Sequence, residues 1–358
     1  MGKNFKRVIV FMLMAVLVVT LVGCGAAKTE EPTESQGPKE EPQPKEQKKV
    51  KISINHTSSL ESPWQKGSLA LAEYANSKSD NLEVEVFGNG VLCQRNWEIM
   101  LEMIQVGSTE AGLESVTALG SIVPELSSIQ LPFLFDDMDH VNQFLANNPP
   151  IWQKWLKEFE KKGLVAIAVS PRRFRQLINN KVLVKTPEDI KGLKFRVPSN
   201  QMFVRIFELL GAKPVPLPSG EIYTSIQLGT VVGEDNSVPV VYDFKTHEVA
   251  DKMTIWNYMT DYSIVVINKE IWESLSKEDQ QILMEAGKEY DKANRAADDE
   301  YAVYAREEME KAGVAFYDMP AAEKEPFKEL VAPMYGELKE KLGEADYNEF
   351  MKAVDDAR

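Results

Sequence analysis

The feature that most constrains the fold is a regular alternation of short strand-like runs with helical segments. Residues 50–54 and 82–87 alternate apolar and polar side chains, which is typical of β-strands. A third strand-like run covers residues 111–115, and helical segments begin near Pro63 and Asn96 between these runs. Because strands that alternate with helices form parallel sheets covered by helices, this order predicts an α/β fold.

The same alternation continues through the middle of the chain. A buried strand is expected at 164–169, further strands at 193–197, 230–235 and 263–268, and helices at 200–210 and 221–228. The sequence therefore predicts two α/β units that divide near residue 173, with a second sheet beginning near Arg175.

A long helix is predicted after the last of these strands. Ser276 and Asp279 have the spacing of a capping box, and a helical pattern of apolar residues runs from there to about Lys311. At 1.5 Å per residue such a helix is roughly 50 Å long. Since that length exceeds one small domain, we expect the helix to brace both units. Residues 321–358 are expected to form two further helices.

The N-terminus has the pattern of a bacterial export signal. A basic start is followed by about 15 residues, 8–22, that are apolar apart from Thr20, too few to span a membrane. The run Leu21-Val22-Gly23-Cys24 resembles a lipobox. We therefore predict residues 1–23 as a lipoprotein signal peptide and Cys24 as the lipidated residue; the alternative is an ordinary signal peptide with an incidental cysteine.

Residues 24–49 follow as a predicted tether. They are rich in Glu, Lys, Pro, Gln and Ser, a composition that cannot form a hydrophobic core, so we expect disorder. A flexible coil of roughly 25 residues has ends about 30 Å apart. The predicted location is extracytoplasmic, with the globular part held at a membrane through Cys24. With Cys24 lipidated, Cys93 is the only free thiol, and no intrachain disulfide forms.

Charge and motifs exclude several functions. The formal net charge of −14 argues against nucleic acid and anionic lipid as partners, because both require clustered Lys and Arg. An anionic ligand must therefore be attracted by a local basic pocket. The three histidines His56, His140 and His247 have no metal-binding spacing, and neither a nucleophile elbow nor a phosphate-binding loop is present. We predict no catalytic residue, no metal site and no cofactor.

Two arginines are the strongest candidate binding residues. Arg175 and Arg196 both lie on short apolar runs, and Arg196 is followed by Val197-Pro198, which ends a strand. Ligands of open α/β sheets bind at the carboxyl ends of strands, where a guanidinium can hold a carboxylate through paired hydrogen bonds. The alternative is a pair of structural salt bridges to nearby acidic residues.

The segments around these arginines resemble a known family. The matching segments are Arg175-Gln176, Thr186-Pro187-Glu188-Asp189-Ile190-Lys191-Gly192-Leu193-Lys194-Phe195-Arg196-Val197-Pro198, Leu210-Gly211-Ala212-Lys213-Pro214-Val215-Pro216 and Glu221-Ile222-Tyr223-Thr224-Ser225-Ile226-Gln227-Leu228-Gly229. They resemble the dicarboxylate-binding family of solute-binding proteins from tripartite ATP-independent periplasmic (TRAP) transporters. The family's usual Asp-Gly-Gln-Glu-Asn-Pro is replaced by Val232-Gly233-Glu234-Asp235-Asn236-Ser237, a departure that bears on the ligand's identity more than on the fold.

The resemblance implies a two-lobe periplasmic-binding-protein-like α/β fold, with a hinge, a cleft between the lobes and a long helix that spans both. We assign residues 50–173 and 262–301 to lobe I, and residues 174–261 and 302–358 to lobe II.

The resemblance also implies a ligand site. By motif, Arg196 clamps a substrate carboxylate, Arg175 is a second anion ligand, and Asn236 lines the cleft. By approximate position, Asn55 and Glu114 reach the cleft as well. Three aromatic residues, Tyr242, Phe244 and Trp256, are further candidates for the cleft wall, although aromatic residues at such spacing are more often part of the core.

The predicted function follows from the resemblance. It implies an extracytoplasmic lipoprotein that captures a small organic acid and delivers it to the membrane permease subunits of a TRAP transporter. Two alternatives remain open: a receptor that presents its ligand to a sensor kinase, and a secreted lyase or hydrolase on the same two-lobe scaffold.

Overall fold

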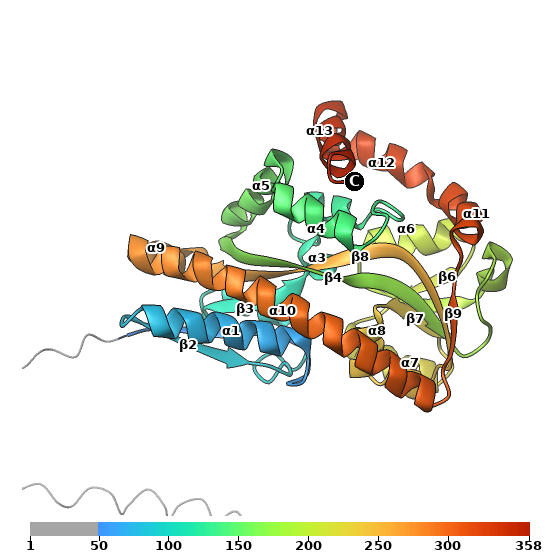
Figure 1. Ribbon diagram of the computed structural model, residues 1–358, viewed down its shortest axis with the longest axis horizontal. Coiled ribbons are helices and arrows are strands. Elements are labelled where there is room, and N and C mark those ends of the chain that lie inside the picture. The colour runs from blue at the N-terminus through green and yellow to red at the C-terminus, as the bar shows by residue number, and fades with distance from the viewer. Residues whose placement is uncertain (1–48) are drawn as a thin grey trace, which may run out of the picture. The chain divides into compact units, whose positions relative to one another are not determined.

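The computed structural model describes residues 49–358, which are built around one mixed sheet (Figure 1). Within these residues the nine strands form a continuous hydrogen-bonded path in the order β2-β1-β3-β8-β4-β7-β5-β6, with β9 paired to β8. The predicted signal peptide, Cys24 and nearly all of the predicted tether lie outside the described residues.

The first part of the sheet has the predicted βαβαβ order. β1 (Val50–Asn55) pairs in parallel with β2 (Leu82–Phe87) and with β3 (Ala111–Ser115). The connecting helices are α1 (Pro63–Lys78) and α2 (Trp97–Gln105). Each begins at a polar N-cap side chain that accepts a backbone hydrogen bond, which satisfies an otherwise unpaired donor of the first turn.

The second part is also parallel. β5 (Lys194–Val197) pairs with β6 (Lys213–Pro216) on one side and with β7 (Gly233–Asn236) on the other. α6 (Gln201–Leu209) and α7 (Ile222–Gln227) connect them. β6 contains two prolines, and its place at the sheet edge leaves their missing N–H groups without consequence.

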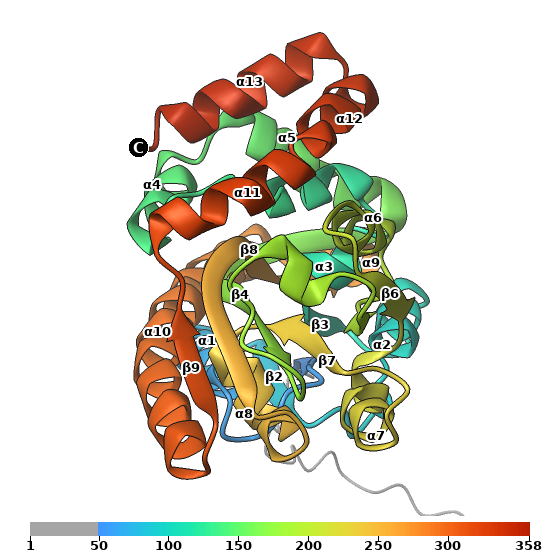
Figure 2. The same ribbon diagram turned by 90° about the vertical axis from the view of Figure 1, so that its right-hand side faces the viewer.

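Two long antiparallel strands join the two parts, β4 (Leu164–Asn179) and β8 (Lys252–Asn268). Figure 2 shows them curving side by side. The expectation of a second sheet beginning near Arg175 was therefore wrong, because β4 continues through that residue. The hydrogen-bond register between β4 and β8 shifts between Arg172 and Arg175, and such an irregularity bends a strand.

Helices cover both faces of this sheet. Along β8, Ile264 and Val266 belong to one hydrophobic core, and Val265 and Ile267 belong to another. This alternation is expected for a strand buried on both sides.

The long helix α10 (Lys277–Lys311) packs against both parts of the chain (Figure 1). It contacts α1 near its start and α8 (Val238–Asp243) further on. Its N-cap is Ser276, whose hydroxyl accepts from the Asp279 N–H at 3.0 Å, so the predicted start is confirmed. At Gly287 a Cβ would lie 2.1 Å from the Ile167 carbonyl oxygen, and the close approach of helix and sheet therefore requires glycine.

Within the described residues, the C-terminal segment forms three helices where two were expected: α11 (Ala321–Val331), α12 (Pro333–Leu342) and α13 (Glu344–Asp355). Two breaks divide it, one at Pro333 and one at Gly343, which has a φ of 79°.

The C-terminal helices contact both parts of the chain. α11 contacts α6, which was assigned to lobe II. α13 packs on α5 (Pro150–Lys157) of lobe I, where the rings of Trp155 and Phe350 have centroids 5.0 Å apart. The boundaries assigned to the lobes stay a prediction.

The remaining elements are short. They are α3 (Val116–Leu119), η1 (Pro124–Gln130), α4 (Met138–Asn147), η2 (Glu158–Lys162), η3 (Pro187–Ile190), η4 (Ser219–Glu221), η5 (Thr246–Glu248), α9 (Lys269–Ser274) and β9 (Ala315–Asp318). Among residues 49–358, none of the helices pairs the length with the apolar character that a membrane crossing requires.

Candidate functional site

The carboxyl ends of strands from both parts of the sheet surround a cavity of about 90 Å³. Glu114 and Ser115 end β3, Arg196 precedes the end of β5, and Asn236 ends β7. The irregular middle of β4 supplies two further arginines, Arg172 and Arg175. The rest of the lining is formed by Thr57, Ser58, Trp64, Trp97, Thr117, Ala118, Pro198, Ser199, Pro218, Ser219, Val240 and Phe244. This is the place where an open α/β sheet is expected to hold a ligand.

Arg196 is a buried cation whose charge is only partly compensated. Its Nε donates to the Leu217 carbonyl oxygen at 2.9 Å, and its Nη1 lies 3.7 Å from Oε2 of Glu234. Within residues 49–358, neither terminal nitrogen donates a hydrogen bond to another residue. Burial lowers the pKa of Arg196 to about 10, although Glu234 opposes that effect. An anion that reached Arg196 would restore the missing compensation.

Arg175, in contrast, already has a partner. Its Nε donates to Oδ2 of Asp235 at 2.5 Å, and its Nη2 donates to the Asp235 carbonyl oxygen at 2.7 Å. The Tyr258 hydroxyl donates to the same carboxylate oxygen at 2.7 Å. Burial acts to lower the pKa of Arg175, but Asp235 outweighs it and the pKa is raised. The structural salt bridge considered for both arginines is therefore formed at Arg175, which still lines the cavity.

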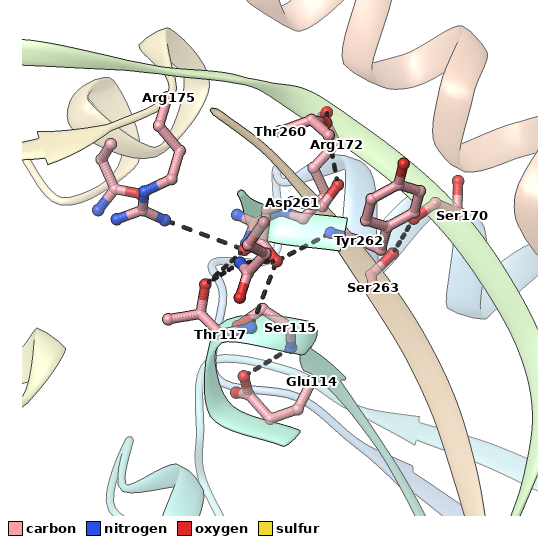
Figure 3. Close-up of polar contacts among 12 residues, drawn as sticks. Glu114, Ser115, Thr117, Ser170, Arg172, Arg175, Thr260, Asp261, Tyr262 and Ser263 are labelled. Atoms are coloured by element: carbon pink, nitrogen blue, oxygen red, sulfur yellow. Dashed lines mark hydrogen bonds and ion pairs between the residues drawn. The ribbon is translucent and has the colours of Figure 1, made fainter. Parts of the chain in front are cut away.

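Arg172 is a cavity residue that the sequence analysis did not single out. Its Nη1 donates to Oδ2 of Asp261 at 3.1 Å, and its guanidinium lies 4.7 Å from the ring centroid of Trp64. Asp261 also accepts hydrogen bonds from the Thr117 hydroxyl and from Gln130, so it is held from several elements (Figure 3).

One signal could have indicated Arg172. Three of the five residues from Arg172 to Gln176 are arginines, namely Arg172, Arg173 and Arg175, in a strongly acidic chain. Simple alternation would place Arg172 and Arg175 on opposite faces of a strand. The register shift between them lets both line the cavity, while Arg173 pairs with Asp298 of α10.

Glu114 brings a carboxyl group into the same cavity. Its Oε1 accepts from the Thr57 hydroxyl at 3.0 Å. Its Oε2 accepts from the Ser115 N–H at 2.9 Å (Figure 3). Burial raises the pKa of Glu114 to about 7, while these hydrogen bonds and the charge of Arg172 act in the opposite direction. Glu114 therefore changes its charge close to neutral pH.

Asn236 is held beside Arg196 by a shared neighbour. Its Nδ2 donates to Oε2 of Glu234 at 3.1 Å, and the other oxygen of Glu234 accepts from Thr246 at 2.8 Å. Burial raises the pKa of Glu234, against the effect of Arg196. Asn236 is thereby fixed at the cavity wall next to the arginine.

The model of the bacterial extracellular solute-binding proteins, family 7, matches residues 54–342. The chain belongs to this family. Members of this family bind solutes for transport. The resemblance of the sequence to TRAP solute-binding proteins is therefore confirmed.

Relatives of this solute-binding protein include a C4-dicarboxylate-binding protein of Bacillus subtilis, 26% identical over 87% of this chain and 88% of that relative. A sugar acid binding protein of Advenella mimigardefordensis, solved with galactonate, is 27% identical and superposes with a TM-score of 0.81 over 87% of this chain and 99% of its own. A TRAP periplasmic solute-binding protein of a Bradyrhizobium species, solved with galacturonate, is 28% identical with a TM-score of 0.79 over 86% and 100% of the two chains. These structures confirm the predicted two-lobe fold with its long helix.

Four of the six residues predicted for the ligand site meet at one cavity. They are Arg196, Arg175, Asn236 and Glu114. Asn55 is buried outside the cavity lining, where its Nδ2 donates to Thr109 Oγ1 at 2.5 Å and to the Ala111 carbonyl oxygen at 3.2 Å.

Tyr242 lines a neighbouring hollow of about 810 Å³ that shares Thr57, Ser219 and Phe244 with the cavity. Its ring stacks on His247 at a centroid distance of 5.1 Å, and its hydroxyl lies 3.5 Å from that of Tyr304 on α10. Of the other two aromatic candidates, Phe244 lines the cavity and Trp256 is fully buried in the core.

The part of the chain that the structure describes contains no group of three or more His, Cys, Asp or Glu side chains arranged to hold a metal ion. What the cavity offers chemically is recognition: a partly compensated guanidinium, a carboxyl group, an amide and several hydroxyl groups.

Proposed function

We propose that this solute-binding protein captures a small organic acid outside the cytoplasm and delivers it to the membrane subunits of a TRAP transporter. The observation that carries the proposal is the buried Arg196, which lines the cavity with its charge only partly compensated. A guanidinium in this state gains charge-assisted hydrogen bonds from a carboxylate without first losing a strong internal partner.

The ligand would also bring together groups from both parts of the chain. Arg196 and Asn236 come from the second part, whereas Glu114 and Thr117 come from the first. A direct contact already crosses the cavity wall, because Asn200 Nδ2 donates to the Thr117 carbonyl oxygen at 3.0 Å. A ligand held by both sides would favour a closed form only by its extra affinity for that form. The closed form is the one we propose to dock on the permease.

Attachment to the membrane through Cys24 is part of the same proposal, and it is supported by the sequence alone. Cys24→Ser should release the protein from the membrane fraction, and loss of the acyl-chain mass from an N-terminal peptide should accompany that release. Retention of the Cys24→Ser variant in the membrane fraction would contradict lipidation at this residue.

The central experiment is to identify the ligand. Native mass spectrometry of purified protein, followed by calorimetric titration with a panel of organic acids, should give a carboxylate that binds with micromolar or tighter affinity. The same acid should fail to bind Arg196→Ala. Binding only of uncharged or cationic compounds would contradict the proposal. Chemical alteration of the bound acid over time would instead favour an enzyme.

A further inference from the structure

We propose that a groove along the free edge of β4 binds an extended segment of a partner protein, which pairs with β4 as an additional strand. The groove has a volume of about 720 Å³ and shares no lining residue with the cavity that Arg196 lines. It is therefore a second binding site, separate from the one proposed for the transported solute.

The first half of β4 is an edge of the sheet. β8 pairs with β4 from Leu164 onward, whereas β7 pairs with β4 only at residues 176–179. Among residues 49–358, no other strand pairs with β4. An edge of this kind presents backbone N–H and C=O groups with which another chain can pair.

The register identifies two residues whose backbone groups point outward. The Asn268 N–H of β8 donates to a backbone carbonyl oxygen that immediately precedes β3. Because hydrogen-bonded and non-hydrogen-bonded pairs alternate along antiparallel strands, Val266 and Ile264 also bond to β3. Their partners on β4 are Ala166 and Val169, so the N–H and C=O groups of these two residues point away from β8.

Ala166 and Val169 are half-buried and line the groove. In the part of the chain that the structure describes, neither residue has a backbone hydrogen bond outside its own strand. Between them the register shifts at Ile167, whose carbonyl oxygen lies against Gly287 of α10. A bulge of this kind disfavours indiscriminate pairing, so the edge suits a short, specific segment.

The two walls of the groove differ in character. In Figure 1, β4 runs between α5 above and α10 below, which pack on opposite faces of the sheet. α4 and α5 supply the apolar side chains of Leu145, Trp152 and Leu156. α10 supplies Met284 and Lys288. Since a strand directs alternate side chains to opposite faces, one row of a bound segment would face the apolar wall and the other would face α10.

The charges of the groove favour acidic residues in the row that faces α10. Lys288 and Lys157 line the groove, and within residues 49–358 neither forms an ion pair. Of the two acidic residues in the lining, Asp291 is already paired with Arg295 at 2.7 Å, and Glu160 lies beyond the end of α5. The side chain of Lys288 is thus available to a carboxylate on the bound segment.

The occupant that fits is therefore a segment of another protein in which apolar and acidic residues alternate. Residues 25–49 of the chain itself contain four prolines, and their largest other apolar side chain is alanine. Proline cannot donate to a strand ladder. A second copy would present the same edge between the same two helices, so the two edges would be kept apart.

The test uses the peptide Val-Glu-Val-Glu-Val-Glu, blocked at both ends and labelled with a fluorophore. By fluorescence anisotropy the wild-type protein should bind it with a dissociation constant of about 10–100 µM. Methylation of the valine backbone nitrogens blocks one edge of the peptide, and methylation of the glutamate nitrogens blocks the other. Because only one edge pairs with β4, one methylated peptide should bind about tenfold more weakly, and the other should bind like the parent.

Variants of α10 locate the binding. Met284→Glu places a carboxylate in the wall that faces the glutamates of the peptide and should weaken binding about tenfold. Val303→Glu makes the same change of charge at an exposed position of the same helix outside the groove, and should leave binding unchanged. Hydrogen exchange should show the Ala166 and Val169 amides protected by the peptide.

Three results would overturn the inference. They are absence of binding at about 1 mM peptide, equal binding of the two methylated peptides, and a loss in Val303→Glu as large as that in Met284→Glu. Protection confined to residues outside 164–172 would do the same. None of these results bears on solute binding at Arg196, which the proposed function concerns.

Discussion

Arg196 of β5 and Glu234 of β7 are register partners on neighbouring parallel strands, yet their closest charged atoms, Nη1 and Oε2, lie 3.7 Å apart. Both side chains are almost fully buried. A fold selected only for stability would be expected to close this pair or to replace it with apolar residues. The distance between the two side chains is consistent with a role for Arg196 in binding the negative charge of a ligand.

Arg196→Ala should weaken binding of the cognate acid by about 100-fold or more, and Arg196→Lys should recover little of the loss. Lysine retains the charge but cannot form two parallel hydrogen bonds to one carboxylate. Calorimetry measures both effects. The matched control is Arg205→Ala, because Arg205 pairs with Glu337 on the surface, away from the cavity. Near-normal affinity of Arg196→Ala would remove the proposed carboxylate clamp.

Arg175→Ala should mainly affect stability, with a loss of about 3–5 kcal/mol in the free energy of unfolding. Its removal leaves the Asp235 carboxylate buried without its cation. Arg196→Ala should cost less, because Arg196 has no closely formed pair to lose. Urea unfolding of the two variants side by side checks this order. A larger loss in Arg196→Ala would show that the 3.7 Å pair is stronger than its geometry implies.

Glu114 should make the ligand-free protein less stable as the pH rises. Burial raises its pKa from 4.5 to about 7, so the folded state binds a proton more tightly than the unfolded state. The resulting stabilisation is complete below about pH 4.5 and is lost as the pH rises through 7, and it amounts to about 1–3 kcal/mol. Urea unfolding at pH 5 and pH 8 should show this difference in the wild type.

The same measurement on Glu114→Gln isolates the contribution of this residue. Other buried groups also titrate in this range, among them Asp298, whose pKa burial raises to about 6. The wild type should therefore lose more stability than Glu114→Gln over the same interval. Identical pH profiles for the two proteins would mean that Glu114 titrates normally.

Gly287→Ala should destabilise the protein by about 2–4 kcal/mol, although alanine is the better helix former. The new Cβ would lie 2.1 Å from the carbonyl oxygen of Ile167, so α10 must move away from β4. Gly336→Ala is the control, since no atom lies within 4 Å of its added Cβ in α12. That change should stabilise by about 0.5–1 kcal/mol. Thermal melts that rank the two variants the other way would exclude close packing at Gly287.

Much of the fold could be predicted because its signals are local. The start of α10 depends on Ser276 and Asp279, three residues apart, and β3 occupies the predicted residues because its five residues read as a short strand between polar segments. The continuity of β4 could not be predicted in this way. The arginines at 172, 173 and 175 interrupt the apolar pattern, and only pairing with the distant β8 extends the strand through them.

The residues of the candidate site also differ in whether local sequence signals could identify them. Arg196 and Asn236 were identified from a motif in the sequence, and strand order brings them together. Arg172 was missed because its position in the cavity depends on a register shift that periodicity does not contain. Asn55 was expected at the cavity from its place at the end of β1, but its amide is used to bind the chain before and within β3.

The continuity of β4 and β8 has a mechanical consequence. Because the same two strands belong to both parts of the chain, the cleft can widen only if these strands flex. Their pairing is irregular on both sides of Arg175, with one register shift between Arg172 and Arg175 and another between Arg175 and Leu177, and Arg172 and Arg175 both line the cavity. A ligand that contacts these two arginines would therefore also contact the irregular segment of the strands that join the two parts of the chain, which is where bending is expected.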